Sequence, residues 1–321
     1  MADDYQAELT RLEKAAAAAL DELSGPLPER SDALTDSHAN VDLLGQVGDL
    51  FSHHATRFAV TSQSGVGEAV RDSVAQLCLH CKVLTTMTRT VASLSVQSRQ
   101  TDLLTGARKT LRALLAVIQA VRTCDRNDKS LPNQEMGKLF ESVKSLKAVA
   151  PNNVTSTWKA LTKLIALLRD AQSEMHQTIR EADSSQQEAD SVEQMRNSLR
   201  ALGISVQLVK HVILFVQKLR NAENPVEAQV EWQDAVLASA RALSPAVDDT
   251  VAAWDDEDVD AARESTRSVV AAARVLLNTL ADSEYWLQRP LTGKTSSHEA
   301  WQRLLNDILD EVHERSLSVG L

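Results

Sequence analysis

The chain has 321 residues, a formal net charge of −10 and a pI of about 5.3. Hydrophobic residues make up 43%, which is enough to bury a core, whereas aromatic residues make up only 3% and glycines number 10. Sheets favour aromatic and β-branched residues and use glycine in their turns, so this composition favours helices. An acidic chain without a run of Lys and Arg is a poor match for phosphate groups, so direct nucleic-acid binding and docking on an anionic membrane are not expected.

Membrane insertion and secretion are not predicted either. No stretch approaches the roughly 20 consecutive apolar residues that a transmembrane helix needs. The sequence begins Met1-Ala2-Asp3-Asp4, which is acidic where a signal peptide is basic. Three cysteines do not build a disulfide framework, so a reducing compartment, the cytosol or the nucleus, fits best.

Apolar residues at alternating spacings of three and four predict helices along most of the chain. In the first half, the expected helices span about residues 3–24, 40–63, 68–96, 101–121, 134–149 and 154–183. Breaks are expected at Gly25-Pro26-Leu27-Pro28, at Ser64-Gly65-Val66-Gly67 and at Pro151, where Gly or Pro interrupts the pattern. Thr101 is expected to cap the fourth helix with its hydroxyl group.

The second half contains the clearest apolar stripe of the sequence, which predicts a long helix to about residue 221 with one face buried. The stripe consists of Met195, Leu199, Leu202, Val206, Val209, Ile213 and Val216. Further helices are expected to open at Asn224-Pro225 and at Ser244-Pro245, because Pro fits the first turn of a helix. The acidic run 255–258 should begin the next helix, where carboxylates interact favourably with exposed amides. The final helix carries Trp301, Leu305, Ile308 and Val312.

The stretch from Ala182 to Gln194 has almost no apolar content, and it reads equally as a domain boundary or as a solvated helix end. Taken as a boundary, it divides the chain into an N-terminal bundle, residues 1–184, and a C-terminal bundle, residues 185–321. The predicted fold is therefore all-α, with two packed antiparallel bundles of long helices. The stripes could pair with another chain as zippers, but several stripes of similar length in one chain favour seams inside the molecule.

Cys78-Leu79-His80-Cys81 is the one close pair of thiols in the sequence. A zinc ribbon would need a second pair of ligands, and a redox pair would lie at the start of a helix near a strand. This pair lies inside a helical stripe, so a packing role is favoured. A metal-dependent enzyme that uses both thiols with His53 or His54 remains as one hypothesis. Without a phosphate-binding glycine loop, a zinc-protease motif or a nucleophile elbow, the sequence predicts no enzyme activity and no cofactor.

Two C-terminal segments carry a family resemblance. They are Ala240-Arg241-Ala242-Leu243-Ser244-Pro245-Ala246-Val247-Asp248-Asp249 and Trp301-Gln302-Arg303-Leu304-Leu305-Asn306-Asp307-Ile308. They resemble an Ile-Ser-Pro-Ser-Val-Asp-Asp segment and a closing Trp-x-x-Leu-Leu-x-x-Ile segment of the Grap2-and-cyclin-D-interacting family, also called the cyclin-D-binding protein or Maid family. Weaker similarity lies between Thr157 and Glu181. The family-motif positions, which are structural, are Ser244, Pro245, Val247, Asp248, Asp249, Trp301, Leu304, Leu305 and Ile308.

The resemblance implies an all-helical, two-part protein without catalysis that acts in the nucleus and the cytoplasm. Members of the family are described as binding D-type cyclins and helix-loop-helix factors, and as restraining proliferation or transcription. We therefore expect a non-catalytic protein-interaction regulator with a D-type cyclin or a helix-loop-helix factor as its partner. The alternative is a vinculin- or talin-like cytoskeletal scaffold, which shares the long heptad helices and the acidic character.

Overall fold

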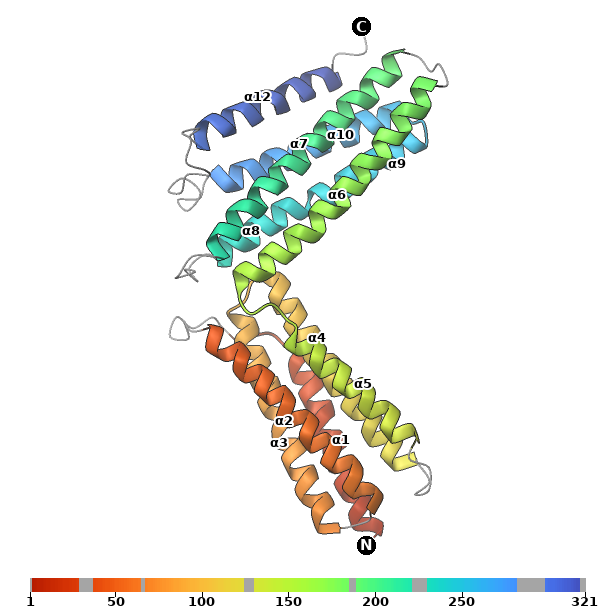
Figure 1. Cartoon of the computed structure of the whole chain (residues 1–321), viewed down its shortest axis with the longest axis vertical. Helices are drawn as coiled ribbons and strands as arrows, with labels where there is room; N and C mark the ends of the chain where they lie inside the picture. The colour runs from red at the N-terminus through yellow and green to blue at the C-terminus, as the bar shows by residue number, and fades with distance from the viewer. Residues whose placement is uncertain are drawn as a thin grey trace. The chain divides into compact units, whose positions relative to one another are not determined.

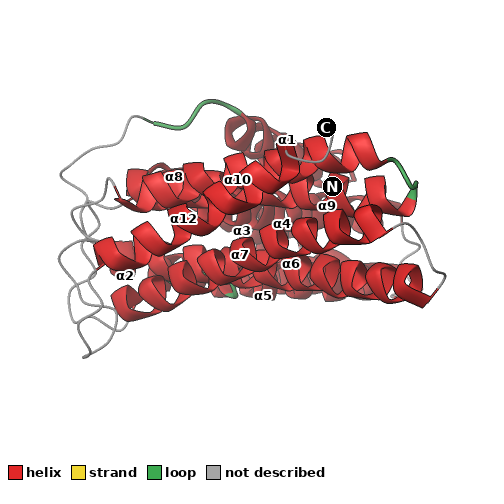
Figure 2. Ribbon diagram, turned by 90° about the horizontal axis from the view of Figure 1, so that it is seen from above, coloured by secondary structure: helices red, strands yellow, loops and turns green. Residues whose placement is uncertain are grey.

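The computed structural model describes residues 2–28, 37–64, 67–123, 130–184, 189–220, 230–281 and 298–317. Helices account for nearly all of these residues, and no strand occurs among them (Figure 2). The predicted all-α fold, two antiparallel bundles of long helices, is confirmed. The helices (Figure 1) are α1 (Ala2–Ser24), α2 (Ser37–Ser64), α3 (Gly67–Ser93), α4 (Gln97–Thr123), α5 (Ser130–Lys147), α6 (Asn153–Ser184), α7 (Ala189–Arg220), α8 (Val230–Arg241), α9 (Leu243–Asp255), α10 (Val259–Ala281) and α12 (His298–Leu317).

The chain divides into two compact units, Met1–Ser156 and Thr157–Leu321. The polar stretch that predicted a boundary at 184/185 therefore lies within the second unit, around the connection between α6 and α7. The apolar face of α6 explains the difference, since Leu161, Leu168 and Met175 are buried and α6 is grouped with the C-terminal helices from Thr157 onward. As a boundary between separately folding domains, 184/185 stays a prediction.

In the first unit, α1 packs on α3 and α4, α2 packs on α3 and α5, and α4 packs on α3 and α5. Arg57 pairs with Asp72 at 2.8 Å, and the ring centroids of His54 and His80 lie 4.7 Å apart, which shows that α2 and α3 run antiparallel. The apolar stripes meet in a single core. Its fully buried members include Leu9, Leu12, Phe51, Phe58, Leu77, Leu84, Leu111 and Leu114.

A buried arginine connects two turns of the first unit. The Arg99 side chain is 0% exposed, and its Nε and Nη2 atoms donate to the carbonyl oxygens of Ala150 and Pro151 at 3.1 and 2.8 Å. Its Nη1 atom donates to Oδ1 of Asn153 at 3.4 Å, and the same oxygen accepts a hydrogen bond from the Val96 amide at 3.0 Å. The turn before α4 is thereby held against the turn before α6.

This junction corrects the predicted start of the fourth helix. The helix begins at Gln97, and Thr101 lies inside it, where its hydroxyl donates to the Gln97 carbonyl oxygen at 2.9 Å. Thr101 is therefore not a cap. The Val96 amide, at the start of this helix, is satisfied instead by Asn153, which is distant in sequence, so no local pattern could have indicated the boundary.

In the second unit, α10 packs on α7, α8, α9 and α12, and α12 also packs on α7. Helix α7 is buried over a wider face than its stripe predicted, because Ile204, Leu208 and Phe215 are also buried while Leu199 and Ile213 are half-buried. Among the described residues, Ala189–Gln217 is the one segment that is long and apolar enough, by length and composition, to cross a membrane. This segment was not predicted from the sequence, because its apolar residues do not form one unbroken run. Its most apolar window is 56% buried inside the structure, as expected of a core helix.

The helix starts of the second unit match the predictions in part. Asn224-Pro225 lies outside the described residues. Helix α9 begins at Leu243, so Pro245 does lie in its first turn. The acidic run 255–258 both ends α9 and starts α10. Glu257 adopts a positive φ of 58° at the end of α9, and Asp258 accepts a hydrogen bond from the Ala261 amide at 3.0 Å as a cap of α10.

A candidate interaction groove

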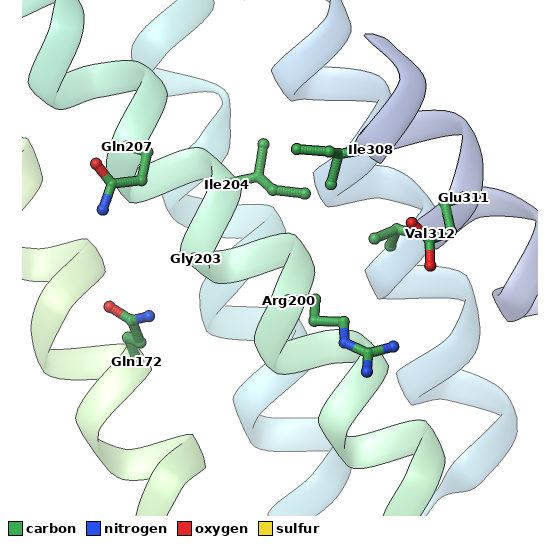
Figure 3. Close-up of a pocket in the computed structure, with 8 residues that line it drawn as sticks. All are labelled: Gln172, Arg200, Gly203, Ile204, Gln207, Ile308, Glu311 and Val312. Atoms are coloured by element: carbon green, nitrogen blue, oxygen red, sulfur yellow. The ribbon is translucent and has the colours of Figure 1, made fainter. Parts of the chain in front are cut away.

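An open groove of about 560 Å³ lies on the second unit between α6, α7 and α12 (Figure 3). Its lining is contributed by one residue of α6, four of α7 and three of α12. The lining residues are Gln172, Arg200, Gly203, Ile204, Gln207, Ile308, Glu311 and Val312. Because such a hollow has an apolar floor and few polar groups, it is a candidate binding site.

Gly203 of α7 leaves room in the groove on the side of α6. A Cβ atom on Gly203 would lie 3.4 Å from Nε2 of Gln172, so any side chain here would enter the groove. The apolar floor comes from Ile204 and Val312, which are 8% and 1% exposed, and from the half-buried Ile308. In Figure 3, Ile204 and Ile308 point toward each other from α7 and α12.

Two interactions hold α12 beside this floor. The Asn197 side chain on α7 donates from Nδ2 to the Val312 carbonyl oxygen at 3.2 Å, and the Asn197 side chain is buried. On the outer side of α12, Arg274 of α10 forms an ion pair with Asp310. The α12 wall of the groove is therefore fixed to both neighbouring helices.

The rim of the groove is polar. Arg200, Gln207 and Glu311 are exposed, and Gln172 is half-buried. The guanidinium of Arg200 lies 3.8 Å from the carboxylate of Glu193 on the same helix. One cation, one carboxylate and two amides around an apolar floor are suited to orienting a bound protein segment.

The structure brings one of the predicted family-motif residues to this groove. Ile308 lines it, and Trp301, Leu304 and Leu305 lie on the same helix, although their side chains are outside the description. The remaining motif residues belong to α9, where Val247 is buried, Ser244 is half-buried, and Pro245, Asp248 and Asp249 are exposed. The other residues of the groove were not predicted from the sequence to form a site. The available signal was Gly203, the single glycine in the clearest apolar stripe.

The thiol pair of α3 is a packing feature. Cys81 is buried and Cys78 is half-buried. Burial raises the pKa of both thiols, and for Cys81, with a further contribution from Cys78, it raises the pKa to about 12. A thiol must lose its proton to bind a metal or attack a substrate, so this environment disfavours both roles.

The histidines near these thiols form a small cluster of rings. His54 lies against His80 with ring centroids 4.7 Å apart and against His53 at 5.3 Å. Burial lowers the pKa of His54, and neighbouring His80, His53 and Arg57 lower it further against an opposing effect of Asp72. Within the described ranges, no group of three or more His, Cys, Asp or Glu side chains is arranged to hold a metal ion.

Part of the chain matches a known family. Residues 43–181 match the model of the Grap2 and cyclin-D-interacting, N-terminal domain. The match extends from α2 through α6, so it includes the weaker segment of the resemblance, from Thr157 to Glu181. The two C-terminal segments lie beyond the match, and their family assignment stays a prediction. No curated protein matches the chain.

Proposed function

We propose that this chain, whose residues 43–181 match the Grap2 and cyclin-D-interacting, N-terminal domain, is a non-catalytic regulator that acts by binding other proteins. Its leading partner is a D-type cyclin, as the family name suggests. Through this partner, or through helix-loop-helix transcription factors, it restrains cell-cycle progression or transcription in the nucleus and the cytoplasm. The observation that carries the proposal is the family match over α2 to α6.

Exposed apolar side chains within the matched region support a protein-binding role. Leu43 and Leu50 of α2 are 45% and 48% exposed, and because they are seven residues apart they lie on the same face of the helix. Phe140 on α5, which packs on α2, is 45% exposed. Large apolar side chains that share an exposed face are typical of surfaces that bind another protein.

The experiment is a binding measurement between the purified full-length chain and a purified D-type cyclin. We expect saturable binding that is weakened by replacing both Leu43 and Leu50 with Ser. Val275, which is 55% exposed on α10 outside the matched region, provides the control, and Val275→Ser should bind as the wild type does. If the wild-type chain shows no binding above background, the cyclin proposal is wrong.

The second candidate is a cytoskeletal scaffold of the vinculin or talin kind. Long antiparallel helices with buried seams are the common feature. Actin co-sedimentation with the full-length chain tests this alternative. Sedimentation with actin in the absence of cyclin binding would select the scaffold over the cyclin-binding regulator.

A further inference from the structure

We propose that the groove between α6, α7 and α12 binds an amphipathic helix of a partner protein, and that this helix carries acidic side chains along one flank and basic side chains along the other. The inference rests on the proposed function only in that the chain acts by binding proteins. It adds the location of the site and the chemistry of the segment that the site accepts.

The shape of the floor favours a helical occupant. The α7 residues of the groove, Arg200, Gly203, Ile204 and Gln207, follow the spacing i, i+3, i+4, i+7, so they form a straight face along two turns. Leu214 is seven residues beyond Gln207 on the same face and is 44% exposed, so apolar surface continues along α7. A groove that has a face of α7 as its floor and α6 and α12 as its walls can accept the apolar stripe of another helix.

The α6 wall supplies positive charge. Gln172 marks the side of α6 that faces the groove. Arg169 and His176 lie three residues before and four residues after it, so they share that side, and both are exposed. The guanidinium of Arg169 supplies the positive charge of this wall.

The α12 wall supplies negative charge. Glu311 lines the groove, and Asp307 and Glu314 lie four residues before and three residues after it, exposed on the same side of α12. Asp310 points elsewhere, since it pairs with Arg274. Among the side chains that the structure describes on this side of α12, Arg303, one turn before Asp307, is the basic one. Three carboxylates against one guanidinium leave the described part of this wall acidic.

The two walls thus have opposite charge, and they define a complementary occupant. Its acidic flank would lie against Arg169 on α6, and its basic flank against Glu311 on α12, with apolar side chains between them on Ile204 and Ile308. Arg200 does not cancel this pattern, because the carboxylate of Glu193 lies 3.8 Å from its guanidinium. Opposite charges on the two walls select among apolar helices and set the direction in which one binds.

The test uses a synthetic fluorescent helical peptide of about three heptads, with Leu along its apolar stripe, Glu along one flank and Lys along the other. Two control peptides carry Glu on both flanks or Lys on both flanks. A peptide with exchanged flanks is not a control, since it can bind in the opposite direction. With the full-length chain, fluorescence anisotropy should show the mixed peptide binding at least about tenfold more tightly than either control, with a preference that weakens in high salt. Equal binding of the three peptides would overturn the proposal.

Two protein variants place the peptide in the groove. Gly203→Leu fills the groove and should weaken binding of the mixed peptide at least about tenfold. Its matched control is Gly137→Leu on α5, where an added Cβ meets nothing within 4 Å, and both changes raise helix propensity alike. Unchanged binding by Gly203→Leu, with a normal circular dichroism spectrum, would contradict the proposed location.

Glu311→Lys tests the charge of the α12 wall. It should weaken binding of the mixed peptide and strengthen binding of the peptide with Glu on both flanks. Glu174→Lys is the control, because Glu174 is exposed and lies about 200° around α6 from Gln172. If both variants shift the two affinities equally, the effect is one of net charge and the proposal is wrong.

The two proposals can fail separately. Peptide binding without cyclin binding would remove the cyclin as partner and leave the groove as a helix-binding site. Cyclin binding without a preference for the mixed peptide would remove the groove and leave the cyclin.

Discussion

In the described part of the first unit the largest fully buried polar side chain is a cation, whereas in the described part of the second unit the buried polar groups are hydroxyls, amides and an indole. Arg99 donates to two backbone carbonyl oxygens and to the Asn153 side chain. In the second unit, the Trp254 indole donates to Ser198 at 3.0 Å, and Ser198 and Thr266 share a hydrogen bond of 2.7 Å. The first arrangement holds two turns together, and the second links α7, α9 and α10.

The two units also differ in charge. The first contains 17 Lys and Arg residues against 18 Asp and Glu, and the second contains 17 against 26, so nearly all of the net charge of −10 belongs to the second. An acidic surface raises the local concentration of basic partners and repels acidic ones. The proposed cyclin contacts and the charged groove therefore lie on surfaces of different character, which implies separate partners or separate parts of one partner.

The largest expected effect is on the first unit. Arg99→Leu removes the buried guanidinium and the three hydrogen bonds that it donates, and it leaves the carbonyl oxygens of Ala150 and Pro151 without these donors. We therefore expect a loss of about 3–5 kcal/mol in the free energy of unfolding. Urea denaturation followed by far-UV circular dichroism measures this loss. Arg112→Leu on the exposed side of α4 is the control, expected to stay within about 0.5 kcal/mol of the wild type.

The same variant tests whether the units are energetically separate. All five tryptophans, Trp158, Trp232, Trp254, Trp286 and Trp301, lie in the second unit, so tryptophan fluorescence reports its unfolding alone. We expect Arg99→Leu to shift the circular dichroism transition and leave the fluorescence midpoint in place. If the fluorescence midpoint moves by the same amount, the two units unfold together.

The next effect belongs to the second unit. Ser198→Ala removes the acceptor of the buried Trp254 N–H group, and we expect a loss of about 1–3 kcal/mol in the free energy of unfolding. Tryptophan fluorescence during urea denaturation measures it directly. Ser268→Ala removes an exposed hydroxyl of α10 that bonds back to the Glu264 carbonyl oxygen, and it should change stability by less than about 0.5 kcal/mol. Equal losses in the two variants would contradict a special role for the buried hydroxyl.

The helices could be predicted from the sequence, whereas the buried polar contacts that these variants remove could not. Apolar periodicity predicted the helices and the class of fold in both units, because burial of an apolar stripe repeats every 3.6 residues and is visible locally. The stripe from Met195 to Val216 is a helix, as predicted, yet it is buried around more of its circumference. The extra burial comes from neighbouring helices, among them α8, whose Trp232 ring packs against Phe215. Single-sequence periodicity does not reveal which neighbours a helix will have.

The long-range polar contacts had no signal in the sequence. Arg99 sits in a polar stretch and looks like a surface residue, and its partners follow α5, about 50 residues later. The groove was missed for the same reason, since it needs α6, α7 and α12 together. Gly203 was visible in the stripe, but a glycine inside a helix indicates a close approach only once its neighbour is known.

A smaller effect should follow from replacing Glu257. This residue has a positive φ of 58° where α9 ends, and its amide and that of Asp258 donate to the carbonyl oxygens of Trp254 and Ala253 at 3.2 and 2.9 Å. Side chains with a Cβ disfavour this conformation and glycine does not, so Glu257→Gly should stabilise the second unit by about 1 kcal/mol. Asp256→Gly, at a φ of −83°, lacks this strain and should not stabilise it. A destabilised Glu257→Gly in fluorescence-monitored denaturation would contradict this account of the turn.

The smallest effect is a pH dependence confined to the first unit. Burial and the neighbouring His80, His53 and Arg57 lower the pKa of His54, so the unfolded chain takes up this proton more readily than the folded one. The stability that the neutral His54 ring contributes is therefore complete above the unfolded-state pKa of about 6.5, and it declines as the pH falls below that pKa. We expect the circular dichroism midpoint in urea to fall between about pH 7.5 and pH 5.5, and His54→Gln to reduce that fall. His176→Gln, on the exposed side of α6, should leave this fall in the circular dichroism midpoint unchanged. Because the histidine cluster belongs to the first unit, His54→Gln should not move the fluorescence midpoint of the second unit at either pH.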